Sequence, residues 1–372
     1  MNKYLIISVC LILALILLIF AGCSGGDSSN RFYDLLKLIP SVGKYEGYPM
    51  ILIDYASYRE DNNISFSASS NITEVLTDYL NIVTTDEVGM RLWGSYITGY
   101  GRWALEGIIS DKYVGYDFTC VDAEIQAGTP PADVVAAIGR FNPQATRDAL
   151  NYQDEWPSWV KDAYTIEEYR GITLHSWGDG IEIHMTTRLV PPHVDNLGRA
   201  RPLAITENRL FYAPGLSIMK LMIDASQDKT ESLADLPEFA SIAKKLSEMN
   251  TYAAVIGDEE YATGDPMFEG TYPGPKLKRF VTFGSGLGED EKGTYIVLVI
   301  YHENSNDAEA NISLLEQRIS DTDSVITGRP WRETFPDIDV RTEGNILVAK
   351  LYTERAGIWS DWVYSRDPLL LH

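Results

Sequence analysis

The first 23 residues constrain this chain more than any other stretch, because they predict where the body must fold. Lys3 gives a short positive start, Leu5 to Phe20 is almost unbroken apolar sequence, and Ala21-Gly22-Cys23 follows. A charged start, an apolar run and a small-residue cleavage site are the three parts of a secretory signal. A cysteine directly after Ala-Gly is typical of a lipoprotein signal, in which that cysteine is lipidated and becomes the new N-terminus.

An uncleaved transmembrane anchor is the alternative interpretation. Against the anchor, the apolar run is short for a membrane-spanning helix, which needs roughly 20 residues. Against the lipoprotein signal, Phe20 stands where such signals usually have leucine. We expect residues 1–22 to be removed as a lipoprotein signal peptide and Cys23 to attach the chain to the membrane through lipid. Residues 23–32 are then a polar tether. Both interpretations place the body at the cell membrane, facing outside the cytoplasm.

The composition of the body bounds its size and its partners. Removal of the signal leaves 350 of the 372 residues, enough for about two domains or one large one. The net charge of -22 argues against nucleic acid as a partner, because binding to phosphates needs a basic surface. Cys10 lies in the signal and Cys23 carries lipid, so Cys120 is alone in the body and no intrachain disulfide can form.

Hydrophobic periodicity predicts an α+β fold with mostly antiparallel sheets and flanking helices. The order of elements is similar in residues 33–250 and 251–372, which suggests two α+β units that are diverged repeats. The predicted strands cover 50–55, 116–127, 252–256, 294–301 and 346–352. The predicted helices cover 71–83, 131–138, 143–150, 216–225, 237–249 and 307–319. The Gly- and Pro-rich residues 257–288 are predicted to be mainly loop.

Two β-hairpins are predicted from turn sequences. Asp179-Gly180 separates two alternating runs, 171–177 and 181–189, and Asp-Gly is a strong signal for a two-residue hairpin turn. A second hairpin is predicted about Glu207-Asn208, between residues 203–206 and 209–212.

Three short motifs resemble those of a family of exported, often lipid-anchored bacterial proteins known only as a domain of unknown function. They are Gly139-Arg-Phe-Asn-Pro143 with Ala149-Leu150, Tyr169-Arg-Gly171-Ile172, and Ser232-Leu-Ala-Asp-Leu-Pro-Glu-Phe239. The resemblance covers roughly residues 115–257. It implies an α+β fold and an exported location, and it implies no catalytic residue, because the motifs mark the boundaries of elements.

Catalytic motifs are sparse. Gly284 to Gly288 has its serine one place early for a Gly-x-Ser-x-Gly elbow, and no phosphate-binding glycine loop lies between a strand and a helix. Two Ser-x-x-Lys tetrads, Ser217 to Lys220 and Ser241 to Lys244, lack the companion motifs of acyl-serine enzymes. We therefore expect no cofactor and, on balance, no enzyme, although two distant carboxylates could meet in any fold.

Aromatic residues in turn-like sequence are the candidate binding residues. Trp156, Trp159, Trp359 and Trp362 would stack on a glycan or contact an envelope protein if their rings are exposed. The alternative is that these rings pack over the edges of a sheet. Acidic loops leave open whether calcium binds, since none has EF-hand spacing.

Histidines give the remaining metal hypothesis. Pairing about Asp179-Gly180 would place His175 opposite His184, near enough to share a zinc ion, with His193 as a possible third ligand. A cross-strand pair of structural histidines is the alternative, and the sequence favours it.

The sequence thus predicts a lipid-anchored extracytoplasmic protein of unknown function, a non-enzymatic binding or structural component of the cell envelope. An extracytoplasmic hydrolase with an unmarked carboxylate or metal site is the alternative.

Overall fold

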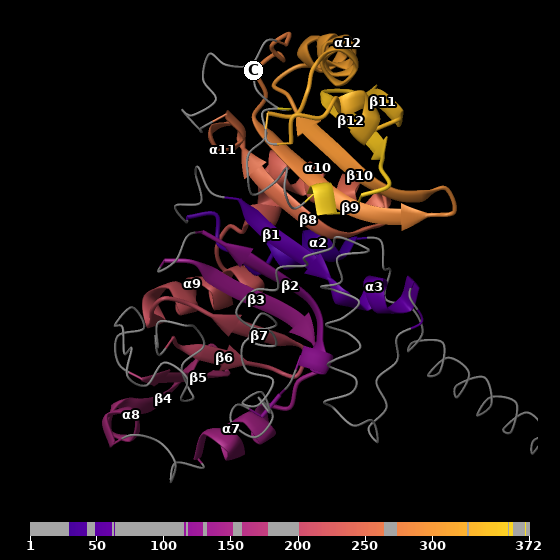
Figure 1. The fold of residues 1–372 in the computed structure, drawn as a ribbon. Helices are drawn as coiled ribbons and strands as arrows, with labels where there is room; N and C mark the ends of the chain where they lie inside the picture. The colour runs from indigo at the N-terminus through magenta and orange to yellow at the C-terminus, as the bar shows by residue number, and fades with distance from the viewer. Residues whose placement is uncertain are drawn as a thin grey trace, which may run out of the picture.

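One antiparallel sheet of twelve strands organises the described part of the chain (Figure 1). The structure is a computed structural model. It describes residues 30–42, 49–61, 63, 115–116, 118–128, 132–151, 158–177, 201–263, 274–325, 327–355, 357–359 and 369. Helices pack on both faces of this sheet, so the α+β class with mostly antiparallel strands and flanking helices is confirmed.

The strands follow the order β11-β12-β10-β9-β8-β1-β2-β3-β7-β6-β5-β4 across the sheet. Their bounds are β1 Met50–Asp54, β2 Val121–Ala127, β3 Val134–Gly139, β4 Tyr164–Tyr169, β5 Ile172–Trp177, β6 Leu203–Ile205, β7 Arg209–Tyr212, β8 Thr251–Asp258, β9 Thr282–Asp290, β10 Gly293–Tyr301, β11 Asp337–Glu343 and β12 Ile346–Tyr352. Neighbouring strands are antiparallel throughout.

Helices connect many of these strands. Their bounds are α2 Arg31–Leu36, α3 Tyr55–Asp61, α7 Pro143–Asn151, α8 Ser158–Ala163, α9 Leu216–Ser226, α10 Pro237–Glu248, α11 Glu259–Thr263, α12 Ser305–Asp321 and α13 Trp331–Thr334, with 3-10 turns η3 Phe118–Cys120 and η5 Leu233–Asp235. None of the described helices is both long and apolar enough to cross a bilayer.

Each face of the sheet carries its own hydrophobic core. We call one the α10 face, because α2, α9 and α10 pack there through residues such as Leu35, Met222 and Ile242. We call the other the α12 face, because α12 and α13 pack there through Leu315 and Trp331. Successive side chains of a strand point to opposite faces of the sheet. A central strand that is buried on both faces therefore has a continuous apolar sequence.

The sequence predicts mainly loop for residues 257–288, but Thr282–Asp290 form strand β9. Glycine-rich sequence is typical of loops. Here, however, Gly284, Gly286 and Gly288 lie in a buried central strand. A Cβ on Gly284 would lie 2.3 Å from the Ile242 side chain of α10. The glycines therefore allow a helix to approach the sheet closely, which is a tertiary requirement.

Two further predictions are wrong. Residues 134–139 form strand β3 and not the expected helix, since this short apolar run is buried between β2 and β7. The predicted pairing of residues 171–177 with 181–189 is contradicted at Leu174 and His175, which pair with β4 on one side and with β6 on the other. Residues 181–189 themselves, like the predicted helix 71–83, lie outside the described residues.

Other predicted elements are confirmed within a few residues. The second hairpin forms as β6 and β7, and the amide of Thr206 donates to the carbonyl of Arg209 across the turn. Strands β1, β8, β10 and β12 and helices α7, α9, α10 and α12 lie where the periodicity placed them.

The two halves of the sheet share one order of elements. The order β1-α3-β2-β3-α7-α8-β4-β5 matches β8-α11-β9-β10-α12-α13-β11-β12. Asp54 and Asp258 each end the first strand of a half and accept a hydrogen bond from the amide three residues on. Asn142 and Asn304 each cap the helix after the third strand. This order supports two diverged repeats, and the pairing of β1 with β8 joins both halves into one sheet.

The repeats differ by an insertion. The β6-β7 hairpin, η5 and helices α9 and α10 follow β5 in the first half. In the sheet, β7 and β6 stand between β3 and β5, whereas β10 pairs directly with β12 in the second half. The division at 250/251 into two units stays a prediction.

Candidate functional site: buried polar groups on the α12 face

Polar side chains replace apolar ones on the α12 face of the first half. Glu124 and Gln126 alternate along β2 with Ile125, which joins the core of the α10 face. Glu124 lies opposite Ile53 of β1 and Ala137 of β3, both members of the core on the α12 face. Its burial is almost complete, with 1% of the residue exposed. Buried ionisable groups are costly unless they are paired, and they are also common at functional sites.

Arg201 and Asp133 form a buried ion pair beside this strand. Their side chains are 1% and 0% exposed, and Arg201 Nη2 contacts a carboxylate oxygen of Asp133. Arg201 Nη1 also donates to the backbone carbonyl of Asp133 at 2.8 Å, and the Gln126 amide donates to the second carboxylate oxygen at 3.1 Å. The arrangement fixes the start of β3 against the chain that leads into β6.

Tyrosine hydroxyls supply the other partners on this face. Tyr55, the first residue of α3, donates to Glu124 Oε1 at 2.9 Å. Tyr116 and Tyr212 share a hydrogen bond of 2.6 Å between their hydroxyls. Burial raises the pKa of the Tyr212 hydroxyl well above its ordinary value. Such contacts hold hydroxyls and a carboxylate in fixed positions inside an otherwise apolar core.

His175 lies at the outer end of the polar face. Its Nδ1 atom is 2.8 Å from the Tyr164 hydroxyl, and the residue is 1% exposed. Burial lowers the pKa of His175 from 6.5 to about 4; the positive charge of Arg147 lowers it further, while Glu168 opposes the shift. Burial raises the pKa of Tyr164 to about 12. The imidazole is therefore neutral near pH 7, and a base this weak is poorly matched to proton transfer there.

A pH dependence of stability follows from His175. The unfolded chain binds a proton near pH 6.5 and the folded chain only near pH 4, so stability is fully present above 6.5 and falls as the pH falls towards 4. At pH 5 the loss from this residue is on the order of 2 kcal/mol. We expect His175→Gln, which can still accept from Tyr164, to flatten this part of the curve. Urea denaturation from pH 8 to pH 5 measures it; an unchanged slope in the variant would contradict the assignment.

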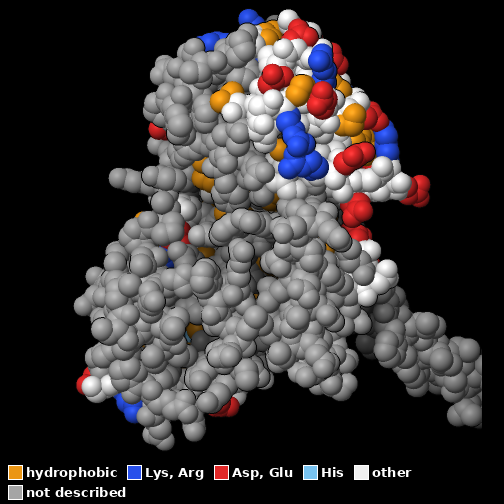
Figure 2. All heavy atoms as spheres, in the orientation of Figure 1, with side chains coloured by type: hydrophobic (Ala, Val, Ile, Leu, Met, Phe, Trp, Pro, Cys, Tyr) orange, Lys and Arg blue, Asp and Glu red, His pale blue; other side chains and the backbone are white. Residues whose placement is uncertain are grey.

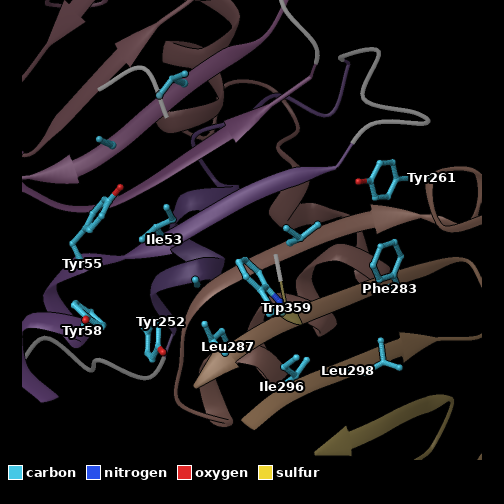
Figure 3. Close-up of a cluster of buried hydrophobic side chains, with 14 of the residues drawn as sticks. Ile53, Tyr55, Tyr58, Tyr252, Tyr261, Phe283, Leu287, Ile296, Leu298 and Trp359 are labelled. Atoms are coloured by element: carbon cyan, nitrogen blue, oxygen red, sulfur yellow. The ribbon is translucent and has the colours of Figure 1, made fainter. Parts of the chain in front are cut away.

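The same positions are filled differently in the second half. With Asp54 matched to Asp258, Glu124 corresponds to Phe283 and Gln126 to Ser285 on β9. Phe283 stacks on Tyr261, with ring centroids 6.2 Å apart, and Ser285 accepts a hydrogen bond from the indole of Trp359. Figure 3 displays this apolar counterpart, in which Trp359 lies over the sheet. The carboxylate and the amide of β2 are thus not repeated at the matching positions of β9.

Trp359 requires a correction to the sequence prediction. It was expected as an exposed binding residue, but it is 3% exposed and its indole N–H donates to Ser285 Oγ at 3.1 Å. Trp359 instead packs against the sheet, which was the alternative interpretation. Its large ring buries much apolar area there, and its one polar atom is hydrogen-bonded. Trp156, Trp362, His184 and Cys23 lie outside the described residues; Trp159 lies in α8, but its side chain is not described.

The structure brings no histidine pair together in its described part. His175 contacts Tyr164 and lies opposite Ile166, since the strands beside β5 are β4 and β6. The described residues contain no group of three His, Cys, Asp or Glu side chains placed to hold a metal ion.

On the surface seen in Figure 2, acidic and basic side chains are interspersed over α12 and its neighbours. Asp290, the last residue of β9, is engaged by Lys350 at 2.5 Å.

Little in the sequence indicates that this polar face is buried. Asp122, Glu124 and Gln126 alternate with apolar residues, a pattern typical of a strand with one side in solvent. The structure buries Glu124 instead, and its partner Tyr55 is 69 positions away in the chain. Arg201 is 68 positions from Asp133. Alternation identifies which side chains share a face, but not what covers that face.

These features define an α+β protein built on one large antiparallel sheet, with a buried ion pair between Arg201 and Asp133 and a buried Glu124 beside it. No family model matches the chain, and no curated protein matches it. Solved structures with some similarity are crystal forms of a protein named TP0453. Form I has a TM-score of 0.39 and 11% identity over 90% of this chain and 98% of that chain. Form III has a TM-score of 0.40 and 11% identity over 87% and 96%. Similarity this distant carries no argument about function.

Proposed function

We propose that this protein is a lipid-anchored component of the cell envelope that faces outside the cytoplasm and binds an envelope protein or glycan without catalysing a reaction. The signal-like start, Cys23 and the acidic, soluble composition of the body support the location. The family resembled by the motifs at residues 139–143, 169–172 and 232–239 is also exported.

The observation that carries the non-enzymatic part is the pairing of the buried ionisable groups. Asp133 is held by Arg201 and Gln126, and Glu124 accepts from Tyr55. A general acid or base must reach the proton that it transfers, in a substrate pose. Carboxylate oxygens already committed to buried protein donors are better suited to stabilising the fold, and His175 is a weak base at neutral pH.

The anchor gives the first test. Cys23→Ala should abolish acyl labelling and signal processing in cells, because the thiol is the site of lipid attachment. The variant should remain as the unprocessed precursor, and the body should leave the membrane fraction only when residues 1–22 are cut off separately. Metabolic labelling with an alkyne fatty acid, followed by immunoprecipitation, measures the first effect. Persistent labelling of the variant would disprove attachment at Cys23.

The binding role is separated from the hydrolase alternative by one experiment on envelope material. Purified residues 24–372 are incubated with isolated cell envelopes, and both sedimentation of the protein and release of soluble fragments are followed. We expect saturable co-sedimentation without fragment release. Sustained release that is lost in Glu124→Gln, a variant of similar shape, would instead establish the hydrolase and place its carboxylate on the α12 face.

A further inference from the structure

The two ends of the twelve-stranded sheet differ in how they are protected. β11 ends one side and β4 ends the other. Edge strands expose unpaired backbone groups, and proteins usually protect them with charges, proline, bulges or a covering element. β11 has charged residues at four of its seven positions, and α12 packs against it. β4 has charged residues at two of its six positions, and Lys220 of α9 contacts one of them, Glu167. It is the less charged of the two edges, which makes it the edge to consider for binding.

The outward-facing backbone groups of β4 follow from its turn. Arg170-Gly171 is a two-residue turn with positive φ at both positions, and Tyr169 lies opposite Ile172. In such a hairpin the residues that flank the turn form a hydrogen-bonded pair, and hydrogen-bonded and non-hydrogen-bonded pairs then alternate. Ile166 and Glu168 therefore direct their N–H and C=O groups away from β5. In the described part of the chain, β5 is the only strand that pairs with β4.

The side chains at this edge are exposed in the folded protein. Ile166 is 49% exposed and is one of three exposed large apolar side chains among the described residues. Glu168 is exposed on the same face of the strand and accepts from Thr173 at 2.6 Å. The register with β5 is regular over six residue pairs, without a bulge that would twist the edge away. The edge thus offers two backbone positions with one apolar and one acidic side chain.

We propose that the β4 edge binds an extended segment of a partner protein that adds to the sheet as a thirteenth strand and carries basic and β-branched residues. This inference deepens the proposed binding function and rests on it. Strand addition provides affinity through backbone hydrogen bonds and selectivity through alternate side chains. The acidic Glu168 and a chain charge of -22 favour a cationic segment over a second copy of this chain, which would bring an equal negative charge.

Fluorescence anisotropy with a defined peptide tests the inference. The probe is a labelled, end-blocked peptide of about seven residues, the length of an ordinary strand, with alternating lysine and valine. We expect saturable binding to residues 24–372. A peptide with alternate amides N-methylated keeps its charge but loses the donors on one edge, and it should bind about tenfold or more weakly. A glutamate-valine peptide should also bind weakly.

Variants locate the binding edge. Ile166→Pro removes an N–H that points away from β5, so the internal ladder is preserved while the outer edge is blocked. Ile338→Pro is the matched control, because Ile338 is placed in the same way on β11. We expect only Ile166→Pro to lose peptide binding, with both variants folded by circular dichroism. Equal binding by the N-methylated peptide, or by Ile166→Pro, would overturn the proposal, as would a peptide-independent dimer through β4 in sedimentation. A negative result leaves the envelope co-sedimentation test unaffected.

Discussion

Gly284→Val should destabilise the protein more than any other single substitution considered in the core. Gly284 is the third residue of β9, and a Cβ there would be 2.3 Å from Ile242 Cγ2 and 2.9 Å from Leu246 Cδ1. Both neighbours lie on α10 and are fully buried, so relief requires the helix to move off the sheet. Even alanine should cost about 1–3 kcal/mol, the usual range for overpacking, and valine more.

The matched control is Gly215→Ala at the start of α9. A Cβ there meets nothing within 4 Å, and the φ of -172° is extended backbone that any residue adopts. Its cost should stay below about 1 kcal/mol, the size of a helix-cap effect. Urea denaturation followed by circular dichroism compares the midpoints. Equal midpoints for Gly284→Ala and wild type would mean that α10 is not packed on β9 at the described distance.

Breaking the Arg201–Asp133 pair is expected to have the second largest effect. Asp133→Leu leaves the guanidinium of Arg201 buried without the carboxylate that neutralises it, and loss of one partner of a buried pair costs about 3–5 kcal/mol. Arg201→Met should cost a similar amount, because Asp133 then keeps only the Gln126 amide among the side-chain partners described above. Chemical denaturation at neutral pH measures both variants.

The double variant Asp133→Leu/Arg201→Met separates pairing from packing. If the penalty is an uncompensated charge, the double variant should be clearly more stable than the sum of the single effects predicts, because neither charge remains. Strict additivity would show that the two side chains stabilise the protein independently. The envelope co-sedimentation assay on the same double variant shows whether the polar network also serves binding.

The sequence by itself determined most elements whose period is strong and local. α10 and α12 have buried residues at helical spacing, and β12 begins and ends at the predicted residues. The capping box of Ser232 and Asp235 and the turn at Arg170-Gly171 also lie at boundaries that the motifs had marked. These features depend on neighbours within a few positions, which the linear sequence contains.

Only the tertiary structure decided what covers each face and which strands meet. Residues 134–139 are a strand because β2 and β7 pair with them, and Gly284 lies in a strand because α10 needs its missing side chain. Trp359 became a core residue through Ser285, 74 positions away. The burial of Glu124 has the same origin, since a partner far away in the chain makes it stable. Local propensities are weaker than the free energy of burying a surface, so the long-range contacts determined these outcomes.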